Sequence, residues 1–133
     1  MTDQIPDNTP ILVGAGQCVD RLIENAQPPF SSPIALTTAA SKHVLNEIGM
    51  PAQALDTIAV IRTFADAAPA WQATLGSSNN PPESVAQRLG ATPSHRIYSN
   101  AGGTEPMQLL AEMSQEIARG AKRAVLLTGA EAI

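Results

Sequence analysis

The stretch from Ile97 to Ala132 constrains the fold of this chain most. It reads as an apolar strand, a turn with two glycines, an amphipathic helix and a second apolar strand. A side chain on such a strand-to-helix turn is exposed, and the helix N-terminus behind it offers unpaired N–H groups to a developing anion. We call residues Ser99–Thr104 the elbow. Because it contains no Cys or His, the sequence predicts a catalytic scaffold without a catalytic group.

The rest of the chain alternates between strand and helix patterns. Apolar or β-branched runs predict four strands: Ile11–Val13, Asp56–Phe64, Arg96–Ser99 and Ala124–Thr128. Helical spacing between Pro and Gly signals predicts three helices: 33–48 (capped by Ser32), 82–89 and 106–119. The order βαβαβαβ predicts an α/β fold with a mostly parallel sheet. Residues 1–9 are expected to be a flexible lead, and residues 65–82 a long loop.

Composition excludes several classes of function. The net charge is −4 and the eight Lys and Arg residues are scattered, so no basic surface for nucleic acid is expected. No run approaches the ~20 apolar residues that span a bilayer, and the first residues lack the basic start of a signal peptide. We therefore expect a cytoplasmic protein with no membrane partner. The single cysteine, Cys18, is expected to be a small buried apolar group.

Candidate acid–base and metal-binding residues are few. Asp56 and Asp66 flank one predicted strand, and opposite ends of such a run lie ~20 Å or more apart, too far to share one reaction centre. His95 precedes a strand that leads to the elbow, but no carboxylate partner follows from the spacing. No His or Cys pair has the spacing of metal ligands, so no metal is expected.

The motifs around the elbow resemble the thiolase superfamily. In thiolases an Asn stands three residues before the nucleophilic Cys, a Gly closes the next helix seventeen residues after it, and a hydrophobic strand then ends in a small-small-acidic turn. Asn100, Gly120 and Leu126–Glu131 match this spacing, and Pro10–Gln17 resembles the first strand of the family. Gly103 then occupies the position of the nucleophile. The resemblance covers most of the chain but only the first part of the family's N-terminal half.

The resemblance carries implications for fold and function. It implies a layered fold in which residues 10–133 form a partial N-terminal domain, in a protein related to acetyl-CoA acetyltransferases. Without a Cys at Gly103, and without the His and second Cys of the family's C-terminal half, no catalytic residue is assigned and this chain is expected to be inactive. No cofactor is implied, other than acyl-CoA as substrate or ligand. A homo-oligomer, or a companion chain supplying the missing half, is expected. The elbow residues expected to face acyl-CoA are Ser99, Asn100, Gly102, Gly103 and Thr104.

Two other functions remain open at this point. A noncatalytic oligomerisation or interaction module is compatible with the absent catalytic set. A small nucleotide-binding α/β domain is supported by Gly14, Gly16 and the crossover pattern, although the Gly-x-Gly-x-x-Gly and P-loop motifs are missing. Glu105, next to the elbow glycines, would repel a phosphate there.

Overall fold

A three-stranded parallel sheet forms the centre of the protein. The computed structural model describes residues 4–21, 25–68 and 70–132. The strand order is β2-β1-β3, and both neighbours run parallel to the central strand. The strands are β1 (Thr57–Val60), β2 (His95–Tyr98) and β3 (Val125–Thr128). The predicted α/β fold with a parallel sheet is therefore confirmed.

The central strand is buried on both faces. All four residues of β1 are buried, which explains why its sequence is continuously apolar or β-branched rather than alternating. β1 is shorter than the predicted run Asp56–Phe64, because the chain turns into a 3₁₀ helix, η2 (Phe64–Asp66), soon after the strand ends. A second 3₁₀ helix, η1 (Ala52–Ala54), precedes the strand.

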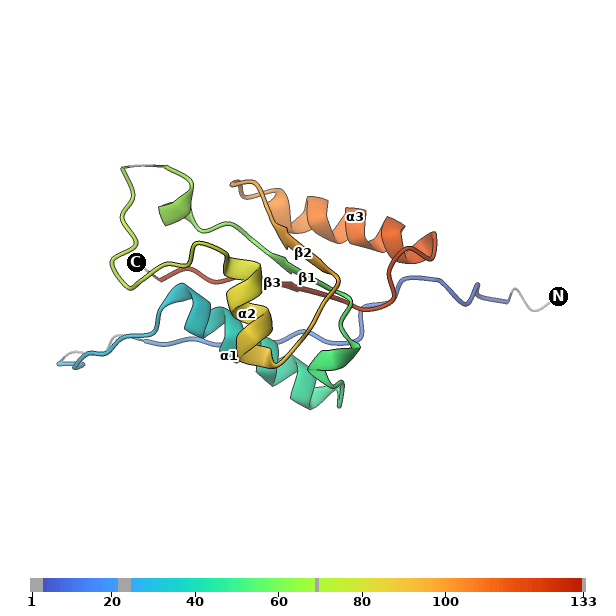
Figure 1. Ribbon diagram of the computed structural model, residues 1–133, viewed down its shortest axis with the longest axis horizontal. Coiled ribbons are helices and arrows are strands. Elements are labelled where there is room, and N and C mark those ends of the chain that lie inside the picture. Colours follow the sequence, from blue (N-terminus) through green and yellow to red (C-terminus); the bar gives the residue numbers. More distant parts are fainter. Residues whose placement is uncertain (1–3, 22–24, 69, 133) are drawn as a thin grey trace.

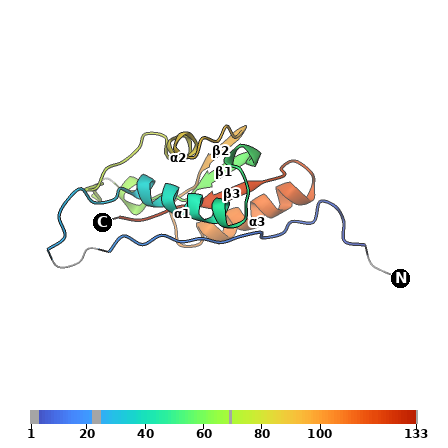
Figure 2. The same ribbon diagram turned by 90° about the horizontal axis from the view of Figure 1, so that it is seen from below.

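Helices cover the two faces of the sheet unequally (Figure 1). Two helices lie on one face, and the third lies on the other (Figures 1 and 2). Their bounds are α1 (Pro33–Glu47), α2 (Pro81–Leu89) and α3 (Glu105–Ala118). These agree with the predicted helices to within about one residue.

The helix ends follow from local chemistry. The Ser32 side chain accepts a hydrogen bond from the N–H of Ala35, so the predicted cap of α1 is confirmed. In the same way Asn80 caps α2, and Gly90 ends that helix with a φ of +70°. Pro occupies the first turn of all three helices, where its missing N–H costs nothing.

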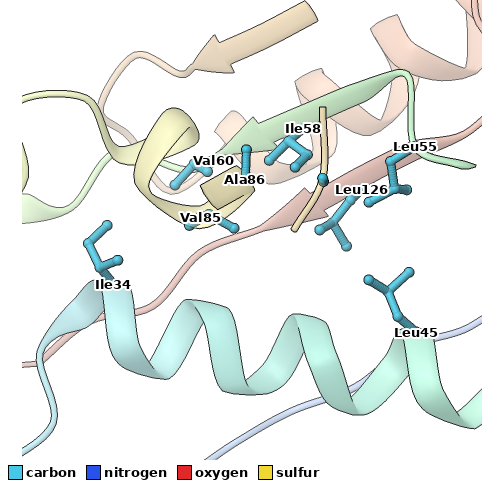
Figure 3. Close-up of a cluster of buried hydrophobic side chains, with 9 residues drawn as sticks. Ile34, Leu45, Leu55, Ile58, Val60, Val85, Ala86 and Leu126 are labelled. Carbon is cyan, nitrogen blue, oxygen red and sulfur yellow. The ribbon is translucent and has the colours of Figure 1, made fainter. Parts of the chain in front are cut away.

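The main core lies between the sheet and the pair α1 and α2. Aliphatic side chains from both helices meet those of β1 and β3 (Figure 3). The buried members are Ile34, Leu45, Leu55, Ile58, Val60, Val85, Ala86, Ala91 and Leu126. These residues contain no aromatic ring, as expected for close packing of helices on a sheet.

The opposite face is covered more thinly. Among the described side chains of α3 only Leu109 and Met113 are buried. Met107 and Leu110 fit an apolar stripe together with Met113, yet they are 67% and 42% exposed. The helix is rotated so that Leu109 faces the sheet instead.

The predicted strand Ile11–Val13 was also wrong. These residues form no strand, and the side chains of Ile11 and Leu12 are 74% and 80% exposed. The segment instead runs alongside α1 (Figure 2). A Cβ on Gly14 would lie 2.6 Å from Cγ2 of Ile48, so the glycine permits a backbone-to-helix contact rather than ending a strand.

Asp56 ties the beginnings of the three strands together. Its carboxylate accepts hydrogen bonds from the N–H groups of Arg123 and Ala124 and from the Thr57 hydroxyl. Its backbone carbonyl accepts the N–H of His95, the first residue of β2. Burial alone would raise the pKa of Asp56, but these hydrogen bonds outweigh it and lower the pKa below its ordinary value.

We predict that Asp56→Asn destabilises the fold by about 1–2 kcal/mol at pH 7, because hydrogen bonds to a charged acceptor are replaced by weaker ones. A carboxyl whose folded-state pKa is depressed stabilises the protein above its unfolded pKa of about 3.9, and this contribution is lost as the pH falls through the folded value. The difference between the two proteins should therefore shrink below about pH 4. Urea unfolding at several pH values measures it, and an equal difference at pH 7 and pH 3 would contradict the prediction.

Candidate functional site

The carboxyl ends of the three strands meet at one edge of the sheet. Because all strands are parallel and in register, Val60, Tyr98 and Thr128 lie side by side at their ends. The elbow follows β2 at this edge, and η2 follows β1. Ligands of open α/β sheets bind outside the carboxyl ends of the strands, so this edge is the candidate site.

Ser99 faces inward and is fully engaged. It is buried, and its hydroxyl accepts a hydrogen bond from the backbone N–H of Arg62 at 2.9 Å. The same hydroxyl donates to the carbonyl of Asn100 at 2.6 Å, and the Ser99 carbonyl accepts from Nε of Arg62 at 2.9 Å. Ser99 therefore fixes the start of the elbow to the end of β1.

The other elbow residues are open to solvent. Asn100, Gly102, Gly103 and Thr104 are all exposed, and a Cβ built on Gly103 would have no neighbouring atom within 4 Å. Gly102 has a φ of +152°, in a range that residues with side chains rarely adopt. The turn from β2 into α3 thus passes through this conformation at Gly102 and not at Gly103.

The start of α3 offers fewer free N–H groups than we expected from the sequence. The N–H of Glu105 bonds to the Gly102 carbonyl, Pro106 has no N–H, and Met107 bonds back to Thr104. The elbow itself retains free donors, because the N–H groups of Gly103 and Thr104 have no partner among the described residues. A ligand oxygen would therefore be held by elbow amides rather than by the first turn of α3.

Arg62 is held by three neighbours at the same edge. Besides Ser99, its guanidinium carbon lies 4.6 Å from the centre of the Tyr98 ring, a cation–π distance. Its Nη1 lies 3.9 Å from the Asp66 carboxylate. Burial first, and then the nearby Asp66 carboxylate, raise the pKa of the Tyr98 hydroxyl above its ordinary value, so this hydroxyl is neutral at pH 7.

A cavity of about 140 Å³ opens at this edge on the side of α1 and α2. Ends of strands, first turns of helices and the loop after η2 line it together. Its lining includes Ile34, Thr37, Val60, Asp66, Tyr98 and Pro81. None of the elbow residues lines it, so the cavity and the elbow are separate features of one sheet edge.

Several predicted candidates lie elsewhere. His95 begins β2 at the opposite end of the strand from the elbow, where Nδ1 lies 3.1 Å from the Ser94 hydroxyl. Asp56 and Asp66 lie at opposite edges of the sheet, as expected. Cys18 was predicted to be buried, and this is wrong because it is exposed. Gly14 and Gly16 pack on α1 rather than in front of a helix, so they form no phosphate cradle.

Sequence reasoning missed Arg62, Tyr98 and Thr37 as residues of this edge. Tyr98 is the last residue of β2, and Arg62 lies two residues after the end of the adjacent strand β1. The predicted strands could therefore have pointed to both residues. Thr37 faces the edge only because α1 begins there.

Glu131, the acidic residue of the thiolase-like turn, holds the start of η2. Its carboxylate accepts a hydrogen bond from the N–H of Phe64 at 2.8 Å.

The described part of the chain contains no group of three or more His, Cys, Asp or Glu side chains placed to hold a metal ion. Within those same residues, every helix is too short or too polar to cross a bilayer.

Comparisons with known proteins agree with the resemblance. No protein-family model and no curated protein matches the chain. One similar solved structure is the monomeric SCP2-thiolase like protein type 1 from Mycobacterium smegmatis, with 31% identity and a TM-score of 0.68 over 90% of this chain and 23% of that chain. Another is 3-oxoacyl-(acyl-carrier-protein) synthase III from Aquifex aeolicus, with 18% identity and a TM-score of 0.59 over 86% of this chain and 32% of that chain.

Both structures have thiolase-superfamily folds. The chain is therefore related to the thiolase superfamily, and the resemblance read from its motifs is confirmed. It spans about a quarter of the first structure and about a third of the second.

We predict that Gly102→Ala destabilises the protein by roughly 1–3 kcal/mol, because a side chain at a φ of +152° is strained. Gly103→Ala is the matched control: its φ is not in this range and nothing lies within 4 Å, so it should be neutral or slightly stabilising. Thermal and urea unfolding of both variants give the comparison. Equal stabilities would show that the elbow has no conformational requirement for glycine.

Proposed function

We propose that this chain is a thiolase-like module that binds an acyl thioester such as acetyl-CoA at its elbow and forms no covalent acyl-enzyme there. The observation that carries the proposal is Gly103, which stands at the position of the thiolase nucleophile in an exposed elbow with no side-chain atom to acylate. Acyl transfer through an enzyme thioester requires a thiolate to attack the carbonyl carbon and expel the CoA thiolate. Glycine supplies neither the thiolate nor any substitute.

The elbow nevertheless keeps groups that suit a neutral thioester carbonyl. The N–H groups of Gly103 and Thr104 have no partner among the described residues, and both belong to an exposed turn. The missing side chain at Gly103 leaves space for a ligand to approach the backbone. Glu105 lies beside Gly102, with its Cγ 3.8 Å from a Cβ placed there, and this carboxylate disfavours a phosphate at the same spot. The thioester end, rather than the phosphates, is therefore assigned to the elbow.

A noncatalytic interaction module is the second candidate, and α3 is the observation in its favour. Met107 and Leu110 expose large apolar side chains on this helix, on the face of the sheet opposite to the main core. β3 also stands at the edge of the described sheet, where an unpaired strand is a template for association. The occupant would be a second copy of this chain or a companion chain with the same kind of fold.

We predict no acylation of the protein by acetyl-CoA. Intact mass spectrometry after incubation should show the unmodified mass for the natural chain and for Cys18→Ala, which removes the exposed thiol as a source of adventitious adducts. An adduct that forms stoichiometrically and turns over, on any residue, would contradict the proposal.

We predict weak noncovalent binding of acetyl-CoA, measured by calorimetry or NMR titration. Gly103→Val should weaken it about tenfold, or ~1.4 kcal/mol, by blocking the elbow amides, while the fold is kept because the site is open. Ala121→Val, an exposed position beyond the other end of α3, is the matched control and should bind normally. Absence of binding at millimolar acetyl-CoA would overturn the assignment of the elbow.

We predict that the chain self-associates through the exposed side of α3. Replacing both Met107 and Leu110 by Glu should shift the assembly to single chains, because like charges repel across a shared face. Light scattering across a wide concentration range measures the mass. A mass of one chain throughout for the natural protein would rule out self-association and leave only a companion chain.

A further inference from the structure

The cavity at the carboxyl edge is lined by a polar group that has no partner among the described residues. Thr37 is only 2% exposed and lines the cavity. The other buried hydroxyls are all hydrogen-bonded within the described chain: Thr38 to Ile34, Ser41 to Thr37 and Thr128, Thr57 to Asp56, and Ser99 to Arg62 and Asn100. The Thr37 hydroxyl bonds to no described residue, and no described fully buried side-chain oxygen lacks a partner. Because the Thr37 hydroxyl has no such partner, it cannot be fully buried, and the 2% of Thr37 that is exposed includes this hydroxyl.

The Thr37 hydroxyl is therefore open to a partner from the cavity, and a ligand or a water there can supply the hydrogen bond that the described residues do not. The lining of this cavity also includes the aliphatic side chains of Ile34, Val60 and Ile61. The site thus combines an apolar volume with one buried hydrogen-bonding group, which is the usual composition of a small-molecule pocket.

The volume limits the size of the ligand. A cavity of about 140 Å³ is comparable to an engineered protein cavity of ~150 Å³ that holds a benzene molecule. A ligand of about six non-hydrogen atoms fits such a space. A longer chain would extend beyond this volume toward the opening of the cavity, where it gains fewer apolar contacts.

The charges around the cavity select an uncharged ligand. Asp66 is the one charged residue in its described lining. Arg62, the cation that contacts Tyr98 and Asp66 of the lining, is already engaged with Ser99, Tyr98 and Asp66. An anionic head group would meet a carboxylate and no free cation, so carboxylates and phosphates are disfavoured.

We propose that this cavity binds a short, uncharged aliphatic molecule that carries one hydrogen-bonding group, with the Thr37 hydroxyl as its polar contact. This inference does not depend on the proposed function, because no elbow residue lines the cavity.

Primary amides from acetamide to octanamide, titrated into the full chain and followed by amide-resolved NMR, test the proposal. The tightest binding is expected near butyramide, with shifts in the cavity lining and none in the elbow. Butyrate, of equal size but anionic, should bind at least tenfold more weakly. Equal affinity for butyrate, tighter binding of octanamide, or shifts confined to the elbow would each overturn the proposal.

Thr37→Val removes the hydroxyl at constant shape and should weaken butyramide binding at least fivefold. Thr38→Val is the matched control, since Thr38 is also buried but its hydroxyl bonds within the helix and does not line the cavity. It should bind butyramide normally. If Thr37→Val does not fold, Ala65→Leu narrows the cavity from another element and should abolish binding. Normal binding by either cavity variant would refute the assignment.

Discussion

The parallel register of β1 with both of its neighbours determines the arrangement of everything else in this protein. Each residue of β1 pairs with β2 on one side and β3 on the other, and each is buried. Such a strand has no polar face, so helices must cover both sides of the sheet. Parallel pairing also places the three strand ends, and the loops that follow them, at one edge. The elbow and the cavity are neighbours for this reason alone.

Two polar residues reinforce opposite ends of this arrangement. At the amino edge Asp56 accepts N–H groups from the residues before β3, and its backbone accepts from β2. At the carboxyl edge Arg62 joins the end of β1 to Ser99 after β2. Both act across strands whose hydrogen-bonding ladder is only four residues long. Short parallel strands have few backbone hydrogen bonds, so these side chains supply a considerable share of the polar contacts that hold the strands in register.

The parts of the fold that were predictable from the sequence are those decided by local chemistry. Pro at the helix starts, Ser32 as a cap and the β-branched run of β1 locate their elements to within a few residues. The failures are those decided by tertiary contacts. Ile11–Val13 has the composition of a strand, yet Gly14 brings this segment against Ile48, the C-cap of α1, and no periodicity in the sequence encodes that choice. The rotation of α3 that buries Leu109 instead of Leu110 is a similar case, because both residues fit an apolar stripe.

The candidate site divides in the same way. The elbow was visible in the sequence because glycines, an Asn and a helix start are contiguous, whereas the cavity was not, because Thr37, Asp66 and Tyr98 come from three distant segments. Their chemistry also differs. The elbow presents backbone amides beside the carboxylate of Glu105, and the cavity presents the buried Thr37 hydroxyl, with the Asp66 carboxylate also in its lining. Neither offers a free cation among its described residues, and Arg62, the one nearby, is engaged by three partners. An edge of this kind suits the uncharged end of a ligand, a carbonyl or a short chain, and any phosphate the ligand carries must be held away from it.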